Sequence, residues 1–115
     1  MNKKIRKYST TSISINWIES LLHTPIADHR KFASYWILSR YLINIKRIKP
    51  DQAYAIMKDW SLRCNEIRSL SPSIREFDNK IRNDIKEAIK TGKASIGDKL
   101  LKNMNNELYR MVFSK

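Results

Sequence analysis

Residues 28–46 read DHRKFASYWILSRYLINIK, and this stretch decides the fold class of the chain. Asp28 is a good N-cap for a helix that ends near Lys46. Apolar side chains cover most of the circumference of this helix at Phe32, Ala33, Tyr35, Trp36, Ile37, Leu38, Leu42, Ile43 and Ile45. A helix that is apolar all round is buried, so the stretch predicts a central helix with basic residues at both ends.

Amphipathic patterns on both sides of this stretch predict further helices. A short helix is expected over residues 14–23, and Pro25 ends it. Pro50 suits the first turn of a helix over residues 50–69. Its apolar positions step at three and four, which indicates one core-facing stripe: Ala53, Ile56, Met57, Trp60, Cys64 and Ile67.

Two capping boxes are expected to begin the last two helices. Ser73 with Glu76 precedes a helix that ends near Gly92, and Ser95 with Asp98 precedes the final one. The final helix carries an apolar stripe at Leu100, Leu101, Met104, Leu108, Met111 and Val112. The sequence therefore predicts an all-α fold, a single compact bundle of about five helices.

Length and composition agree with one domain of this kind. The chain has 115 residues, of which 42% are apolar, enough to give a helical bundle a core. Two glycines and three prolines are too few for the turns of an all-β sandwich or barrel. Residues 1–13 are basic, aperiodic and rich in Ser and Thr, so we expect a flexible lead-in there and the domain over residues 14–115.

The charge of the chain indicates a polyanionic partner. Lys and Arg number 23 against 11 Asp and Glu, a net charge of +12. Residues 1–49 contribute +8 of this excess, from ten basic and two acidic side chains. Nucleic acid is the partner that such a density of positive charge favours. A basic solvated surface without a partner is the plainer alternative.

No pattern in the chain indicates catalysis or a bound metal. A single cysteine, Cys64, and two scattered histidines cannot make a structural zinc site, and we expect no metal site. No nucleophile stands with a base, and no phosphate loop is present, so we expect no catalytic residues and no cofactor of its own. No apolar stretch reaches the length of a membrane span. These features favour an intracellular, reducing location.

Single-stranded nucleic acid is bound where cations hold the backbone and aromatic rings stack on bases. Both ingredients occur between residues 17 and 63. Tyr54 and Trp60 are possible stacking residues, and Tyr41 is a further candidate. The spacing of Trp36 and Trp60 also fits a packed core, which is the alternative role for both rings.

A family resemblance sharpens this reading. Residues 17–31 read WIESLLHTPIADHRK, and residues 36–46 read WILSRYLINIK. This pattern resembles the helix-bundle domain of archaeal plasmid primase-polymerases and the related small accessory X subunit of archaeal primases. The family often has Gly where His29 stands and Pro where Arg40 stands, so the chain departs from the pattern at these two positions.

The resemblance implies a noncatalytic primase domain that binds single-stranded DNA template and the initiating nucleotides, ATP or dNTP. A separate catalytic domain, in the same or a partner chain, would carry out primer synthesis in DNA replication and supply the Mg. We expect a monomer without a membrane partner. The expected nucleotide- and template-binding residues are Asp28, Arg30, Lys31, Arg40, Tyr41, Asn44, Lys46 and Arg47.

Two other functions remain open from the sequence. A double-stranded DNA reader of the helix-turn-helix type would place the helix after Ser73 in the major groove. That helix carries basic side chains at Arg75, Lys80, Arg82, Lys86 and Lys90. The second alternative is a protein-docking bundle of a replication enzyme, whose charge serves solubility alone.

Overall fold

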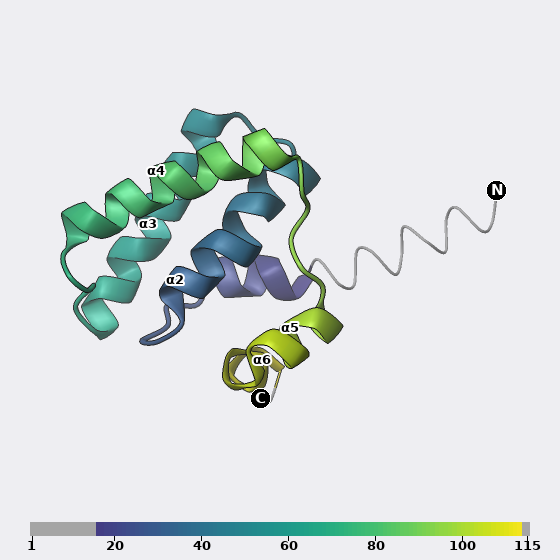
Figure 1. Cartoon of the computed structure of the whole chain (residues 1–115). Coiled ribbons are helices and arrows are strands. Elements are labelled where there is room, and N and C mark those ends of the chain that lie inside the picture. The colour runs from purple at the N-terminus through teal and green to yellow at the C-terminus, as the bar shows by residue number, and fades with distance from the viewer. Residues whose placement is uncertain (1–15, 114–115) are drawn as a thin grey trace.

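The computed structural model describes residues 16–113, and every regular element in this range is a helix (Figure 1). Residues 16–22 form the first helix. The others are α2 (Arg30–Phe32), η1 (Ala33–Leu38), η2 (Tyr41–Ile45), α3 (Pro50–Ile67), α4 (Ile74–Thr91), α5 (Asp98–Met104) and α6 (Asn106–Phe113). The predicted all-α class is confirmed, and the predicted lead-in over residues 1–13 lies outside the described range.

The central helix is formed by α2, η1 and η2, which follow one another through helical residues over 30–45. Its inner side chains Ala33, Ile37, Leu38 and Leu42 are fully buried, as the sequence predicts. The sequence did not indicate that η1 and η2 are π-helical. In η2, for example, the amide of Lys46 donates to the carbonyl of Tyr41, five residues earlier, at 2.8 Å.

The long helices α3 and α4 pack against each other and against the central helix (Figure 1). Met57, Trp60 and Cys64 of α3 are fully buried, and so is Ile81 of α4. The predicted core stripes were too wide, because several of their apolar residues are exposed. These are Ile56 and Ile67 of α3, Leu100 and Met104 of α5, and Met111 of α6.

Three of the predicted helix ends are confirmed. Pro50 occupies the first turn of α3. The amide of Glu76 donates to the hydroxyl of Ser73 at 3.1 Å, which caps the start of α4. Gly92 ends α4 with a φ of +68°, a left-handed conformation that glycine adopts without steric cost.

The predicted N-cap of the central helix was wrong. His29, not Asp28, is the N-cap residue, with a left-handed φ of +64° and no side-chain capping bond. The carboxylate of Asp28 instead pairs with the guanidinium of Arg68 at 2.6 Å. A partner 40 residues away therefore outweighs the local capping preference, and the helix starts later than predicted.

The predicted start of the final helix was also wrong, and that helix is two helices. Gly97 is the N-cap of α5, while the hydroxyl of Ser95 donates to the carbonyl of Ile96. The chain then leaves the helix at Asn105, whose side-chain oxygen accepts the amide of Leu108 at 3.0 Å. An Asn at this position favours a new helix start, so the described residues hold six helices rather than five.

The last two helices lie at one end of the bundle, joined to it by residues 92–97 (Figure 1). The rings of Trp17 and Phe113 lie 5.6 Å apart and connect α6 with the first helix. Both ring nitrogens of His29 form hydrogen bonds with this part of the chain. One bonds to the carboxylate of Glu107 at 2.5 Å, and the other to the side-chain amide of Asn105 at 3.1 Å. Within residues 16–113, no helix has the length and apolar character needed to span a membrane.

Candidate nucleotide and nucleic-acid site

A polar pocket of about 240 Å³ opens at the amino-terminal end of the central helix. One wall is formed by the residues around the start of that helix, and the other by the segment between α3 and α4. The lining residues are Ala27, Asp28, His29, Arg30, Lys31, Arg68, Ser69, Leu70, Ser71 and Phe77. Three of the predicted binding residues, Asp28, Arg30 and Lys31, are thus brought together in one pocket.

Arg30 is buried beside this pocket, and its donors are already engaged. Its guanidinium donates to the carbonyls of Cys64 at 3.0 Å, Arg68 at 2.5 Å and Ser69 at 3.0 Å. These carbonyls belong to the end of α3 and the residues just after it, where helices leave acceptors without partners. Arg30 therefore closes the carboxyl end of α3 and neutralises the negative end of its dipole.

Lys31 and Arg68 are the exposed cations of the pocket. Lys31 forms no hydrogen bond or ion pair with the residues that the structure describes. Arg68 pairs with Asp28, but both side chains are more than half exposed. Such a pair contributes little to stability and exchanges easily for another anion. Sequence reasoning missed Arg68, because nothing in its own neighbourhood in the sequence indicates that it faces residues 28–31.

The other predicted residues lie near the opposite end of the central helix. Tyr41 is buried, and its hydroxyl donates to the carboxylate of Glu19. Lys46 donates to the same carboxylate at 2.8 Å. These hydrogen bonds, that of Lys46 first, lower the pKa of Glu19 from its ordinary value of 4.5. Burial and the bond to Glu19 together raise the pKa of Tyr41. Tyr41 and Lys46 thus join the central helix to the first helix.

We expect this contact to lose its contribution to stability in acid. A carboxylate whose pKa is lowered on folding stabilises the fold above its unfolded pKa, and the effect disappears as pH falls through the folded pKa. Wild type should therefore exceed Glu19→Gln in unfolding free energy by about 1 kcal/mol at pH 6. The difference should shrink as pH falls below 4.5, the ordinary pKa of the carboxyl, and disappear below the lowered pKa of the folded state.

Urea denaturation followed by circular dichroism at several pH values measures this difference. The isosteric Gln preserves the shape of the site, removes the charge and replaces one of the two acceptor oxygens by an amide donor. Glu66→Gln serves as the control, because Glu66 is exposed and forms no bond with the described residues. A gap between wild type and Glu19→Gln that stays constant from pH 6 to pH 3 would contradict the assigned role.

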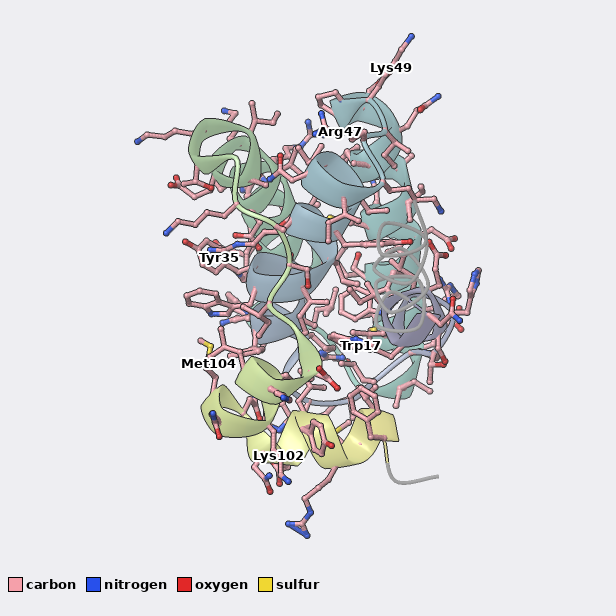
Figure 2. All side chains as sticks on the ribbon, turned by 90° about the vertical axis from the view of Figure 1, so that its right-hand side faces the viewer. Trp17, Tyr35, Arg47, Lys49, Lys102 and Met104 are labelled. Carbon is pink, nitrogen blue, oxygen red and sulfur yellow. The ribbon has the colours of Figure 1, made fainter. Side chains whose placement is uncertain are left out.

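Asn44 joins the central helix to the end of α4. Its side-chain amide donates to the carbonyls of Ala88 at 2.9 Å and Lys93 at 2.6 Å. The loop after η2 and the segment after α4 consequently meet at one end of the bundle, where Figure 2 shows Arg47 and Lys49 projecting. We call the exposed cations of these two segments and of the last turn of α4 the basic end: Arg47, Lys49, Lys90 and Lys93.

All four cations of the basic end are exposed, and one of them, Arg47, is a predicted site residue. None of its four side chains forms an ion pair with a described residue. Sequence reasoning indicated Arg47 and missed Lys93 as a site residue. The signal for Lys93 is its place just after Gly92, because a glycine in left-handed conformation turns the chain back toward the helix end.

The two possible stacking residues are both occupied within the fold. Trp60 is fully buried, and its indole N–H donates to the carbonyl of Leu21 at 3.1 Å, so it is a core residue. Tyr54 donates to Asp78 at 2.6 Å, and the guanidinium of Arg82 lies 4.2 Å from its ring centre. The burial of Trp60 excludes stacking on a base, whereas Tyr54 is half-buried and has the cations of Lys58 and Arg82 over its ring.

Arg40 lies between the two ends of the central helix, buried against the rings of Tyr35 and Trp36. Burial raises the pKa of the Cys64 thiol, which packs in the core as a neutral group. In the part of the chain that the structure describes, no three His, Cys, Asp or Glu side chains gather in a group that could hold a metal ion.

The comparison with protein families identifies the family of the chain. The sequence pattern of Primase X matches residues 11–115, nearly the whole chain. A comparison with curated proteins gives no match. The Primase X family consists of small accessory, noncatalytic subunits of archaeal primases, which act in replication. The match spans both ends of the central helix and every helix described above, and on this ground the chain belongs to the Primase X family.

Proposed function

We propose that this chain holds an initiating nucleoside triphosphate in the pocket beside α2 and a single-stranded template at the basic end. Chemistry would take place in a catalytic primase subunit that carries its own Mg. Joining two nucleotides without a primer requires three mobile pieces to be held together, and positioning of this kind can supply a large part of the rate. The pocket that unites Asp28, Lys31 and Arg68 is the observation that carries the proposal.

The surroundings of the pocket suit a triphosphate. It opens at the amino-terminal end of a helix, where unpaired amides and the helix dipole favour an anion. Arg30 occupies the carbonyls at the facing end of α3, which would otherwise repel phosphate. Lys31 and Arg68 then remain as exposed donors, and phosphate oxygens can replace the carboxylate of Asp28 on Arg68.

The basic end suits the backbone of a DNA strand. Its cations come from two segments that Asn44 holds together, so they form a surface rather than a string of independent side chains. Lysine and arginine contacts to phosphate release bound counterions, which makes the affinity fall with salt. Strand binding at this surface is therefore expected to weaken steeply as salt rises.

The pocket is tested by calorimetric titration of ATP into the double variant Lys31→Ala/Arg68→Ala. The loss of two charge-assisted contacts should weaken ATP binding about tenfold or more. Lys86→Ala/Lys99→Ala is the matched control, because it removes the same charge from exposed positions elsewhere. Equal losses in both double variants would mean that only net charge matters, and the pocket assignment would be abandoned.

Strand binding is tested separately with a fluorescent dT oligonucleotide. Arg47→Ala/Lys93→Ala should weaken strand binding and flatten its salt dependence by roughly 0.7 units of log–log slope per lost phosphate contact. The same variant should leave ATP affinity unchanged. A duplex oligonucleotide of equal length provides the comparison with the helix-turn-helix alternative.

The helix-turn-helix alternative finds less support in the arrangement of α4. Lys80 is paired with Asp84 at 2.9 Å, and Arg82 with Asp78 at 3.2 Å, so two of the five basic side chains are already engaged. A major-groove reader needs such side chains free to reach base edges. Tighter binding to duplex than to single strand would nevertheless favour this alternative over our proposal.

A further inference from the structure

Arg40 is a buried cation without an acceptor. Its side chain belongs to a residue that is only 6% exposed, yet its guanidinium forms no hydrogen bond or ion pair with any residue in the described range 16–113. Its nitrogens are not among the fully buried side-chain atoms that lack a partner, so the guanidinium keeps a small opening to water. Arg40 thus retains hydrogen-bond donors that residues 16–113 do not use and that a ligand can reach.

Two aromatic rings surround this guanidinium. Its central carbon lies 5.0 Å from the ring centre of Tyr35 and 4.6 Å from that of Trp36. The ammonium of Lys80 approaches the Tyr35 ring at 5.7 Å. The ring faces stabilise a cation through their quadrupoles, but they provide no carboxylate or carbonyl oxygen for its donors. We call Tyr35, Trp36, Arg40 and Lys80 the Arg40 cluster.

The segment after α4 covers one side of this cluster. It is tied to Asn44 at Lys93 and to Trp36 at Ile96, whose amide donates to the Trp36 carbonyl at 3.2 Å. Residues 36, 40 and 44 lie on one helix face, so the segment passes along the face that carries Arg40. Figure 2 shows it crossing the central helix, with Tyr35 beside it at the edge of the view. The ring of Tyr35 is only half-buried, so the cluster is open to solvent on the side where Tyr35 lies.

We propose that the Arg40 cluster binds one nucleotide of a single-stranded DNA. A base stacks on the exposed part of the Tyr35–Trp36 pair, and the guanidinium of Arg40 donates to a phosphate or to an oxygen on the base edge. The proposal rests on the proposed function for its ligand and adds a base contact to it. Aromatic rings with cations beside them suit an unstacked base, which presents a flat face next to a negative backbone.

The overall charge favours DNA over an acidic protein segment as the occupant. The chain carries +12, and the basic end adjoins the carboxyl end of the same helix, where Arg47 follows Ile45. A strand held by its phosphates at the basic end can therefore continue along the bundle to the cluster. The basic end would hold the backbone, whereas the cluster would distinguish a strand with bases from one without them.

The test compares binding of a dT oligonucleotide with binding of an abasic oligonucleotide that has the same number of phosphates. Wild type should prefer the dT strand by about tenfold, the size expected for one stacked base. The Tyr35→Leu variant should bind the two oligonucleotides almost equally. The Tyr35→Phe variant should keep most of the preference for dT, because it retains the ring. Arg47→Ala/Lys93→Ala should weaken both oligonucleotides equally.

Tyr109→Leu is the matched control, because Tyr109 is half-buried in α6 and also has a lysine, Lys102, 5.6 Å from its ring. Circular dichroism checks that each variant folds. A preference for dT that persists in Tyr35→Leu would overturn the inference and assign the cluster to an acidic protein segment, while strand and ATP binding would still support the proposed function. A wild type that binds no strand would overturn both.

Discussion

Replacement of Trp60 by alanine is expected to lower the free energy of unfolding by about 4 kcal/mol, the largest effect among the changes considered. The ring is fully buried between α3 and the rest of the core, and its N–H is bonded to the carbonyl of Leu21. The substitution removes a large apolar surface, leaves a cavity and takes away one of the two donors to the Leu21 carbonyl, which keeps the amide of Thr24. Urea denaturation measures the loss.

Trp60→Phe separates the core role from a stacking role. Phenylalanine fills part of the space but cannot donate to Leu21, so we expect an intermediate loss of about 1–2 kcal/mol. Strand affinity of the folded Phe variant should match that of wild type. A Trp60→Ala protein that stays as stable as wild type but fails to bind strand would contradict the core assignment and restore the stacking role.

Replacement of Arg30 by methionine is expected to lower the free energy of unfolding by about 3 kcal/mol. The variant keeps an unbranched side chain but loses the donors to three carbonyls, those of Cys64, Arg68 and Ser69. The carbonyls of Arg68 and Ser69 would lose their donor in a partly buried place, while the carbonyl of Cys64 keeps the amide of Arg68. Thermal and urea denaturation should both show the loss.

Lys31→Met is the matched control, since it changes the adjacent residue and the same charge. Lys31 is exposed and makes no bond with the described residues, so stability should change by no more than about 0.5 kcal/mol. For ATP affinity we expect the reverse: Lys31→Met should lose more affinity than Arg30→Met. An Arg30→Met protein of wild-type stability that has lost ATP binding would instead make Arg30 a phosphate ligand.

The sequence predicted the helices wherever one local pattern dominated. The central helix could be predicted because its apolar residues surround the axis, and α4 because Ser73 and Gly92 mark its ends. The prediction failed at Asp28 because Arg68, distant in the sequence, is its partner in the fold. The break at Asn105 was missed because the apolar periodicity continues through it while a single side chain restarts the helix.

The candidate site could be predicted only in part. Asp28 and Lys31 lie in the pocket that the resemblance favours, and Arg47 lies at the basic end. Sequence alone could not show which cations remain available, since that depends on contacts made after folding. Arg30 is engaged by carbonyls and Lys46 by Glu19, whereas Arg68 completes the pocket from another helix end.

The continuity of the central helix fixes the geometry between the two proposed ligands. Lys31 lies in the first turn of this helix and Arg47 just beyond its last residue, Ile45, and the inner face of the helix is packed in the core. The helix therefore keeps the two proposed binding surfaces at a fixed separation. Any rearrangement that brings nucleotide and template toward a catalytic subunit has to move this domain as a rigid body, because the packed helix cannot shorten.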